Sequence, residues 1–92
     1  MAAPDEKQVQ ITNTRGLHAR AAAKFVKLVE QNRAEVSIMK DDMQVSGSSI
    51  MGLLMLSAGK NSVITIAVRG ENAAGVLRDL VALVERRFDE EG

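Results

Sequence analysis

Hydrophobic and polar residues alternate in four short segments of the chain, which is the pattern of a strand with one buried face. The alternating apolar positions are Val9 and Ile11 in a segment near residues 7–13, then Val36 and Ile38, Met43 and Val45, and finally Ile64, Ile66 and Val68. The polar pair Asp41-Asp42 separates the second segment from the third. We therefore predict four strands, of which the middle two are joined by a tight turn.

Three other segments have the features of helices. Apolar residues recur at i, i+3, i+4 and i+7 in a first stripe, made of Ala22, Phe25, Val26 and Val29, and in a last stripe, made of Ala73, Val76, Leu77, Leu80, Val84 and Phe88. These stripes predict amphipathic helices over about residues 18–32 and from residue 73 onward. Between them, the run Ser46-Gly47-Ser48-Ser49 is typical of a helix start and predicts a short helix over residues 50–56.

The predicted order is β-α-β-β-α-β-α. It indicates an α+β fold, an open-faced β-sandwich in which three helices cover one face of a four-stranded antiparallel sheet. Ninety-two residues provide for one domain, and we expect residues 1–92 to form it, with frayed ends at 1–6 and 89–92. The acidic run Asp89-Glu90-Glu91 is expected to be solvated.

Composition narrows the possible functions. Twelve basic and twelve acidic residues give a formal net charge of zero, and two phenylalanines are the aromatic residues, which disfavours a nucleic-acid partner. The absence of cysteine excludes disulfides, a Cys-ligated zinc site and a thiol nucleophile, and a single histidine disfavours any metal site. The start of the chain lacks the features of a signal peptide, and the apolar run 50–56 is too short to span a membrane. We expect a cytoplasmic monomer without cofactor, metal or membrane partner.

The single histidine, His18, is predicted to lie where the first strand's loop meets the first helix. The simplest interpretation is a surface histidine at a helix start. Three neighbouring features favour an anion site instead: the free N–H groups of a helix N-terminus, the guanidinium groups of Arg15 and Arg20, and the backbone freedom of Gly16. An imidazole at such a site could be phosphorylated on a ring nitrogen. The sequence gives no sign of a carboxylate that would orient the ring.

Two motifs resemble those of the HPr family, the histidine-containing phosphocarriers of the phosphoenolpyruvate-dependent phosphotransferase system. Gly16-Leu17-His18-Ala19-Arg20, followed by Ala22-Ala23-Lys24-Phe25-Val26, is similar to the family's active-site motif. Residues 46–56 resemble the segment that contains its regulatory serine. The resemblance covers about residues 7–88. It implies that His18 is the phosphoryl acceptor, forming a pros-phosphohistidine, that Arg20 contacts the phosphate, and that Ser49 is the regulatory serine.

Two residues depart from the pattern of many members. Ala21 replaces a proline just after the arginine, but alanine also favours a helix, so we expect the site to survive. Ser48 replaces a lysine beside the regulatory serine. With Gly52 and Leu54-Met55, this segment is more similar to the nitrogen-related or alphaproteobacterial-type branch than to the sugar-transport type. Ser46 and Ser48 remain alternatives to Ser49 as the modified residue.

The apolar run 50–56 holds more hydrophobic residues than one face of a short helix can bury. We expect Ile50, Leu53 and Leu56 to face the core and Met51, Leu54 or Met55 to face outward. The outward residues either close the edge of the sheet or form a docking patch beside His18. The further candidates for phosphate or partner contacts are Arg15, Gly16, Ala19, Lys24 and Lys27, and we expect Arg15, Arg20, Lys24 and Lys27 to form a positive site apart from the acidic residues at 85–91.

The leading hypothesis is a carrier, not an enzyme in itself, that takes phosphate from enzyme I to an EIIA-type protein and is regulated by an HPr serine kinase/phosphorylase at Ser49. The acceptor, and whether the output is transport or nitrogen regulation, stay open. A purely regulatory binding module is the alternative, although His18 argues against it as the sole role. A third hypothesis, an RNA-binding domain, would need a basic net charge and aromatic residues on the sheet, and the sequence has neither. A hydrolase built from His18 and a serine would need an oriented acid and an oxyanion motif.

Overall fold

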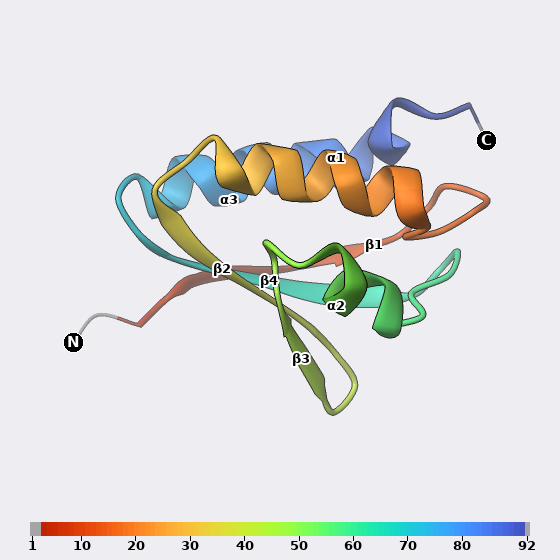
Figure 1. Cartoon of the computed structure of the whole chain (residues 1–92), viewed down its shortest axis with the longest axis horizontal. Coiled ribbons are helices and arrows are strands. Elements are labelled where there is room, and N and C mark those ends of the chain that lie inside the picture. The colour runs from red at the N-terminus through yellow and green to blue at the C-terminus, as the bar shows by residue number, and fades with distance from the viewer. Residues whose placement is uncertain (1–2, 92) are drawn as a thin grey trace.

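Four antiparallel strands form one sheet, and the helices cover one of its faces (Figure 1). The computed structural model describes residues 3–91. Its elements are β1 (Asp5–Gln10), α1 (Ala19–Glu30), β2 (Ala34–Lys40), β3 (Met43–Ser46), α2 (Ile50–Met55), β4 (Val63–Gly70) and α3 (Ala73–Glu85), followed by a 3-10 turn, η1 (Arg87–Asp89). The strands lie in the order β1-β4-β2-β3. The predicted fold class and the order of strands and helices are confirmed.

The core lies between the sheet and the helices, because the strand register brings apolar side chains together on one face. Val9 of β1 is opposite Ile64 of β4, and Ile38 of β2 is opposite Ile66 of the same strand. All four are buried. The predicted apolar stripe of α1 is buried as well, and α1 and α3 pack side by side above the sheet (Figure 1).

The amino-terminal strand begins earlier than the sequence indicated. Asp5 pairs with Val68 and Glu6 with Ala67, so the prediction of a frayed segment over residues 1–6 is wrong for these two residues. Residues 1 and 2 lie outside the described residues. The strand ends at Gln10, and Ile11 beyond it donates its backbone N–H to Ser62 O at 2.8 Å. Pairing with β4 thus fixes where the loop toward α1 starts.

The carboxyl-terminal segment does not continue α3. Arg87, Phe88 and Asp89 all have positive φ, so the chain reverses and inserts the fully buried Phe88 ring into the core. Phe88 was predicted as the last position of the α3 stripe; it is buried, but from the η1 turn. The chain then lies beside the loop that precedes α1 (Figure 1). The prediction of a frayed end is therefore wrong for Asp89 and Glu90, and residue 92 lies outside the described residues.

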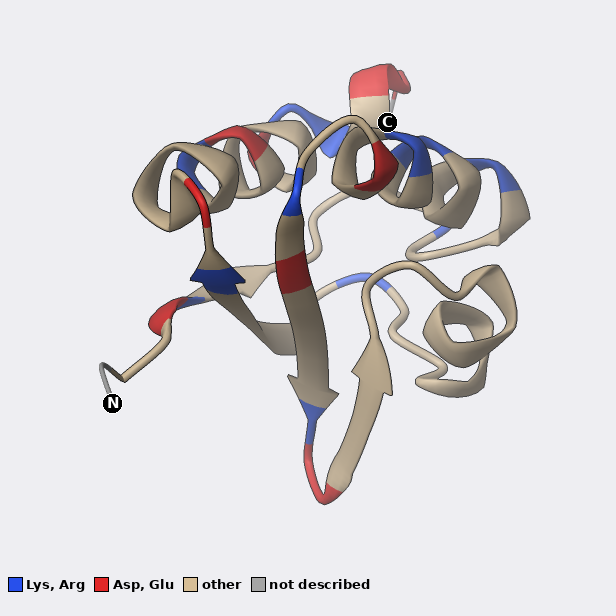
Figure 2. Cartoon of the chain, turned by 60° about the vertical axis from the view of Figure 1, so that its left-hand side comes forward, with Lys and Arg blue, Asp and Glu red and all other residues tan. Residues whose placement is uncertain are grey.

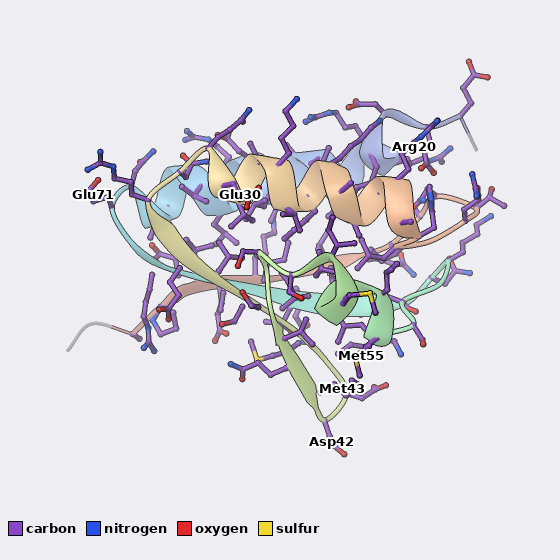
Figure 3. The ribbon with its side chains drawn as sticks, viewed as in Figure 1. Arg20, Glu30, Asp42, Met43, Met55 and Glu71 are labelled. Carbon is purple, nitrogen blue, oxygen red and sulfur yellow. The ribbon has the colours of Figure 1, made fainter. Side chains whose placement is uncertain are left out.

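The short helix α2 exposes much of its apolar surface. Leu53 and Leu56 are buried as predicted, but Ile50 is 40% exposed, which corrects its assignment to the core. The helix has fewer than two turns, and the i, i+3 pair Leu53 and Leu56 already fills its contact with the core. Met51 and Met55 are exposed, as expected, and Met55 is labelled in Figure 3. Among residues 3–91, no helix combines the length and the apolar character needed to cross a membrane.

Candidate functional site at the start of the first helix

A tight loop presents His18 at the start of α1. Gly16 has a φ of +65°, and its N–H donates to Asn13 O at 3.1 Å. A Cβ atom at this position would lie 2.5 Å from the carbonyl oxygen of Ala58, so a side chain has no room there. The next residue, Leu17, donates its N–H to the same Ala58 oxygen at 2.8 Å. Gly16 is buried, and its observed part in the site is to shape the loop.

His18 is the N-cap residue of α1, but its side chain does not cap the helix. Its backbone is extended, and its carbonyl oxygen accepts the N–H of Ala22 at 2.8 Å. The first N–H groups of a helix have no partner within the helix and carry its positive dipole end. The first turn holds no acidic residue. Ala21 is helical and buried, so the first turn forms without a proline at this position, as expected.

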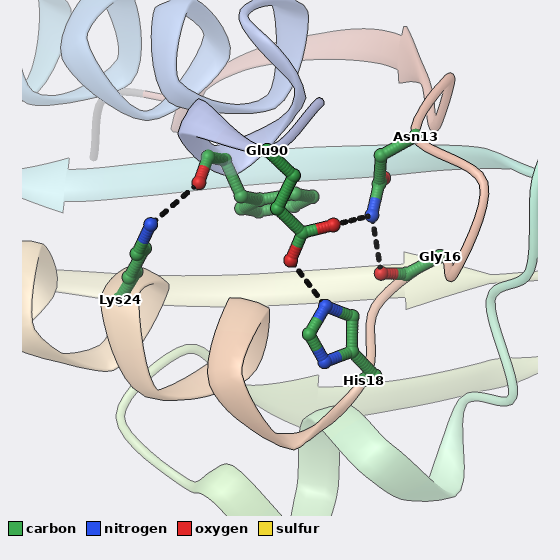
Figure 4. Close-up of polar contacts among 6 residues, drawn as sticks. Asn13, Gly16, His18, Lys24 and Glu90 are labelled. Atoms are coloured by element: carbon green, nitrogen blue, oxygen red, sulfur yellow. Dashed lines mark hydrogen bonds and ion pairs between the residues drawn. The ribbon is translucent and has the colours of Figure 1, made fainter. Parts of the chain in front are cut away.

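The imidazole ring is held from one side by the carboxyl-terminal segment. Nε2 of His18 contacts Oε2 of Glu90, and the other carboxylate oxygen accepts Nδ2 of Asn13 at 2.9 Å (Figure 4). The same Asn13 amide group donates to Gly16 O at 2.8 Å. The expectation of a solvated acidic tail is therefore wrong for Glu90. So is the expectation that no carboxylate orients the ring.

The opposite side of the ring is free. Figure 4 shows Nδ1 directed away from Glu90, and within the described residues this nitrogen has no hydrogen-bond partner. The histidine side chain is 15% exposed. Because one nitrogen is engaged and the other is not, the two ring nitrogens are chemically distinct here.

Charged groups of both signs meet around Glu90, the residue that contacts His18. Arg15, Arg20 and Lys24 line one open pocket of about 330 Å³ together with Asp89, Glu90 and Glu91. Figure 2 shows the acidic end of the chain close to basic segments of α1, and Figure 3 shows Arg20 directed toward this end. The expected separation of the basic site from the acidic residues at 85–91 is therefore wrong. Neither arginine forms a salt bridge with another residue of 3–91.

Glu90 is ionised at neutral pH. Burial alone would raise the pKa of its carboxyl group, but the hydrogen bonds from Asn13 and His18, together with the charges of His18 and Arg15, outweigh burial and lower this pKa. A carboxylate facing a histidine is therefore present in the resting protein.

No group of three or more histidine, aspartate and glutamate side chains that could hold a metal ion occurs in the part of the chain covered by residues 3–91.

The remaining candidate residues lie around α1 and α2. Ala19, Arg20 and Lys27 are exposed, whereas Lys24 is half-buried and donates its Nζ to Phe88 O at 2.7 Å. Lys24 thus contacts the carboxyl-terminal turn (Figure 4). Leu54 is half-buried on α2, next to the exposed Met55.

The three serines before α2 differ in their contacts. Oγ of Ser49 accepts the N–H of Gly52 at 3.0 Å, which confirms the predicted N-cap. Ser46 and Ser48 are exposed, and their Oγ atoms are 2.9 Å apart. Because only the half-buried Ser49 accepts a helix N–H among these three serines, its hydroxyl is the one that supports the helix.

Sequence reasoning missed Asn13 and Glu90 as site residues. Asn13 lies three positions before Gly16, and Glu90 lies two positions after Phe88, the last apolar residue of the chain. The apolar Phe88 close to the end was the available signal that this end is anchored, because a buried aromatic ring fixes the residues next to it.

Comparison with known proteins agrees with this geometry. Residues 5–86 match the family model described as the PTS HPr component phosphorylation site. The chain is 42% identical over 85 residues to the phosphocarrier protein NPr of Shewanella violacea, covering 92% of this chain and 93% of that protein. It is 41% identical over 85 residues to the phosphocarrier protein HPr of Neisseria meningitidis, covering 92% and 96%. The crystal structure of HPr-C-His from Thermoanaerobacter tengcongensis superposes with a TM-score of 0.91 at 33% identity, covering 96% of this chain and 99% of that one.

Proposed function

Because the chain belongs to the HPr family of phosphocarrier proteins of the phosphotransferase system, we propose that it accepts a phosphoryl group on His18 from enzyme I and passes it to an EIIA-type protein. The observation that carries this proposal is the free Nδ1 of His18 beside the uncapped start of α1. The proposed carrier acts as a cytoplasmic monomer and does not complete a reaction by itself.

Nδ1 is the proposed acceptor atom, which makes the product a pros-phosphohistidine. Its lone pair attacks phosphorus, and the bond between phosphorus and the donor breaks. The transferred group brings negative charge to a site where unpaired helix N–H groups and the guanidinium of Arg20 stabilise it. Arg15 supplies a second guanidinium at the same pocket. In the next transfer the acceptor attacks phosphorus, and the N–P bond breaks.

The chemistry of the phosphorylated protein tests this proposal. Incubation with enzyme I and phosphoenolpyruvate should add one phosphoryl group, read by intact mass, in a linkage that is labile in acid and stable in base. The modification should be absent from His18→Ala. An acid-stable modification that persists in His18→Ala would contradict the proposal.

Ser49 is the proposed site of control by a serine kinase. A phosphate at the N-cap meets the positive end of α2, so the fold tolerates it, while its charge repels an acidic surface of the phosphoryl donor. Ser49→Asp should slow transfer from enzyme I, and Ser48→Asp, at an exposed neighbour, should slow it less. Equal transfer rates in wild type and Ser49→Asp would count against control through this serine.

The exposed face of α2 is the proposed docking surface for both transfer partners. Met51 and Met55 are 68% and 63% exposed, and the helix contains no charged residue. Flexible, polarisable methionines suit a surface that must fit two different proteins in turn. Met51→Asp should weaken binding to enzyme I without changing the stability of the fold, which titration and thermal unfolding can separate.

A further inference from the structure

We propose that Glu90 is a positioning residue for phosphoryl transfer, whose carboxylate keeps a proton on Nε2 of His18 throughout the cycle and so directs the phosphoryl group to Nδ1. This inference rests on the proposed role of His18 as the phosphoryl acceptor. It concerns a residue of the carboxyl-terminal segment, 72 positions from the histidine in sequence.

Both oxygens of the Glu90 carboxylate have polar partners. Oε2 contacts His18 Nε2, and Oε1 accepts Nδ2 of Asn13 at 2.9 Å (Figure 4). Asn13 is fully buried, and its amide also donates to Gly16 O, within the loop that presents the histidine. The His18 and Glu90 side chains are only 15% and 16% exposed, so water competes weakly for their contact. The carboxylate is therefore fixed relative to the ring.

The segment that bears Glu90 is anchored on two sides. Phe88, two residues earlier, is fully buried in the core, and its carbonyl oxygen accepts Nζ of Lys24 from α1 at 2.7 Å. Three consecutive residues with positive φ turn the chain so that Glu90 returns to the histidine. Non-glycine residues adopt this conformation at a cost, which the surrounding contacts must offset. The position of Glu90 is thus a product of the fold.

The contact determines which ring nitrogen is nucleophilic. A neutral imidazole carries one N–H and one lone pair, and an ionised carboxylate only accepts hydrogen bonds. Nε2 therefore holds the proton, and Nδ1 holds the lone pair. In the first transfer the Nδ1–P bond forms, the bond between phosphorus and the donor breaks, and the ring becomes positively charged with its Nε2 proton retained.

The same carboxylate serves the second transfer. The acceptor attacks phosphorus, the N–P bond breaks, and its electron pair returns to Nδ1. The ring is then again the neutral Nε2–H form, ready for another cycle, and no proton has left or entered it. Glu90 stabilises the positive charge of the phosphorylated ring, which keeps the N–P bond reactive.

The charges around the ring are compatible with this role. Glu90 contacts one edge of the imidazole, while Nδ1 is directed away from it, so the phosphoryl group and the carboxylate lie on different sides of the ring (Figure 4). Arg15, Arg20 and Lys24 face the same pocket and offset the negative charges of Asp89, Glu90 and Glu91. The lowered pKa of Glu90 is consistent with a carboxylate in this surrounding.

The test compares Glu90→Ala and Glu90→Gln with Glu91→Gln, which changes the exposed neighbouring acid. Nitrogen-15 NMR at about pH 9, where an ordinary imidazole is neutral, reports the tautomer of His18. Wild type and Glu91→Gln should show the Nε2–H form, and Glu90→Ala should acquire Nδ1–H. Phosphorus-31 NMR after phosphorylation should show phosphate on Nδ1 in wild type and an added fraction on Nε2 in Glu90→Ala.

Transfer rates complete the test. Glu90→Ala should slow both transfers about tenfold, which is the lower end of the loss seen when a metal-binding histidine loses its carboxylate partner. The rates of Glu90→Gln should fall between those of wild type and Glu90→Ala, because glutamine keeps an acceptor but loses the charge. A wild-type tautomer, isomer and rate in Glu90→Ala would overturn the role of Glu90 while leaving His18 as the carrier residue. Absence of phosphate from His18 in the wild-type protein would instead overturn the proposed function.

Discussion

Two residues occupy the same position relative to a helix, His18 before α1 and Ser49 before α2, and their side chains are used differently. The hydroxyl of Ser49 accepts the N–H of Gly52 and so caps its helix. The imidazole of His18 makes no such bond and is held from outside the helix by Glu90. One helix start is satisfied by its own N-cap, and the other leaves helix N–H groups and a ring nitrogen available. The start of α1 is therefore the one that is prepared to receive an anion.

The two helices can differ in this way because they are stabilised differently. α1 has twelve residues and a buried stripe that includes Phe25 and Val29, so packing supports it without a side-chain cap. α2 has six residues and one fully buried position, Leu53. A helix this short depends more on its cap. His18, the proposed phosphoryl acceptor, therefore lies at the start of the helix that is stable without a side-chain cap.

The largest expected effect comes from removing the anchor that keeps Glu90 at the ring. Phe88→Ala should destabilise the fold by about 3–5 kcal/mol, because it leaves a cavity in the core. It should also free the His18 ring at the start of α1, while the cap of α2 by Ser49 stays as in the wild type. Urea unfolding measures the first effect, and the His18 nitrogen-15 spectrum measures the second. Phe88→Leu should lose less stability, and an equal loss in the two variants would contradict the packing argument.

The loop before α1 gives the next largest effect. Gly16→Ala places a Cβ atom 2.5 Å from Ala58 O at a positive φ, and we expect a loss of about 3 kcal/mol in the free energy of unfolding. Gly59→Ala is a matched control, because nothing lies within 4 Å of its added Cβ. Chemical denaturation of both variants should separate them clearly. Equal stability would show that the close approach of Gly16 to Ala58 does not matter.

The next effect comes from removing the side-chain cap of α2. Ser49→Ala should lower the free energy of unfolding by about 1 kcal/mol, since the N–H of Gly52 loses its acceptor. Ser48→Ala, one position earlier and exposed, should cost much less. Thermal unfolding of the two variants under identical conditions gives the difference. If Ser48→Ala were the less stable of the two variants, the assignment of the cap to Ser49 would be contradicted.

The smallest expected effect is a pH dependence of the Glu90 contact. Because the pKa of Glu90 is lowered in the folded protein by Asn13, His18 and Arg15, its contribution to stability is present above the ordinary value of 4.5 and is lost as the pH falls through the lowered folded value. Glu90→Ala should therefore be less stable than wild type by about 0.5 kcal/mol at neutral pH, with a smaller gap in acid. A gap that widens in acid would contradict this sign.

The periodic part of the fold was predictable, and so was the candidate histidine. Alternation at Ile64, Ile66 and Val68 and the helical stripe around Phe25 are local patterns, because a sheet face and a helix face repeat within a few residues. The local sequence Gly16-Leu17-His18 likewise placed the histidine at a helix start. These features need no knowledge of distant residues.

The missed features depend on contacts between distant parts of the chain. Glu90 reaches His18 through a reversal at Arg87–Asp89, and none of these three residues is a glycine that would signal a left-handed turn. The burial of Gly16 is set by Ala58, 42 positions later. Ile50 is exposed because α2 ends after six residues, a limit that its apolar run does not reveal.

NMR of the protein phosphorylated with enzyme I and phosphoenolpyruvate tests the proposed roles of His18 and Glu90 most directly. Phosphorus-31 and nitrogen-15 spectra together identify the phosphorylated atom and the protonated nitrogen. We predict one phosphoryl group on Nδ1 of His18, with a proton on Nε2 facing Glu90. Phosphate on Nε2 would contradict the role of Glu90, and phosphate on a serine with His18 unmodified would contradict the role of His18.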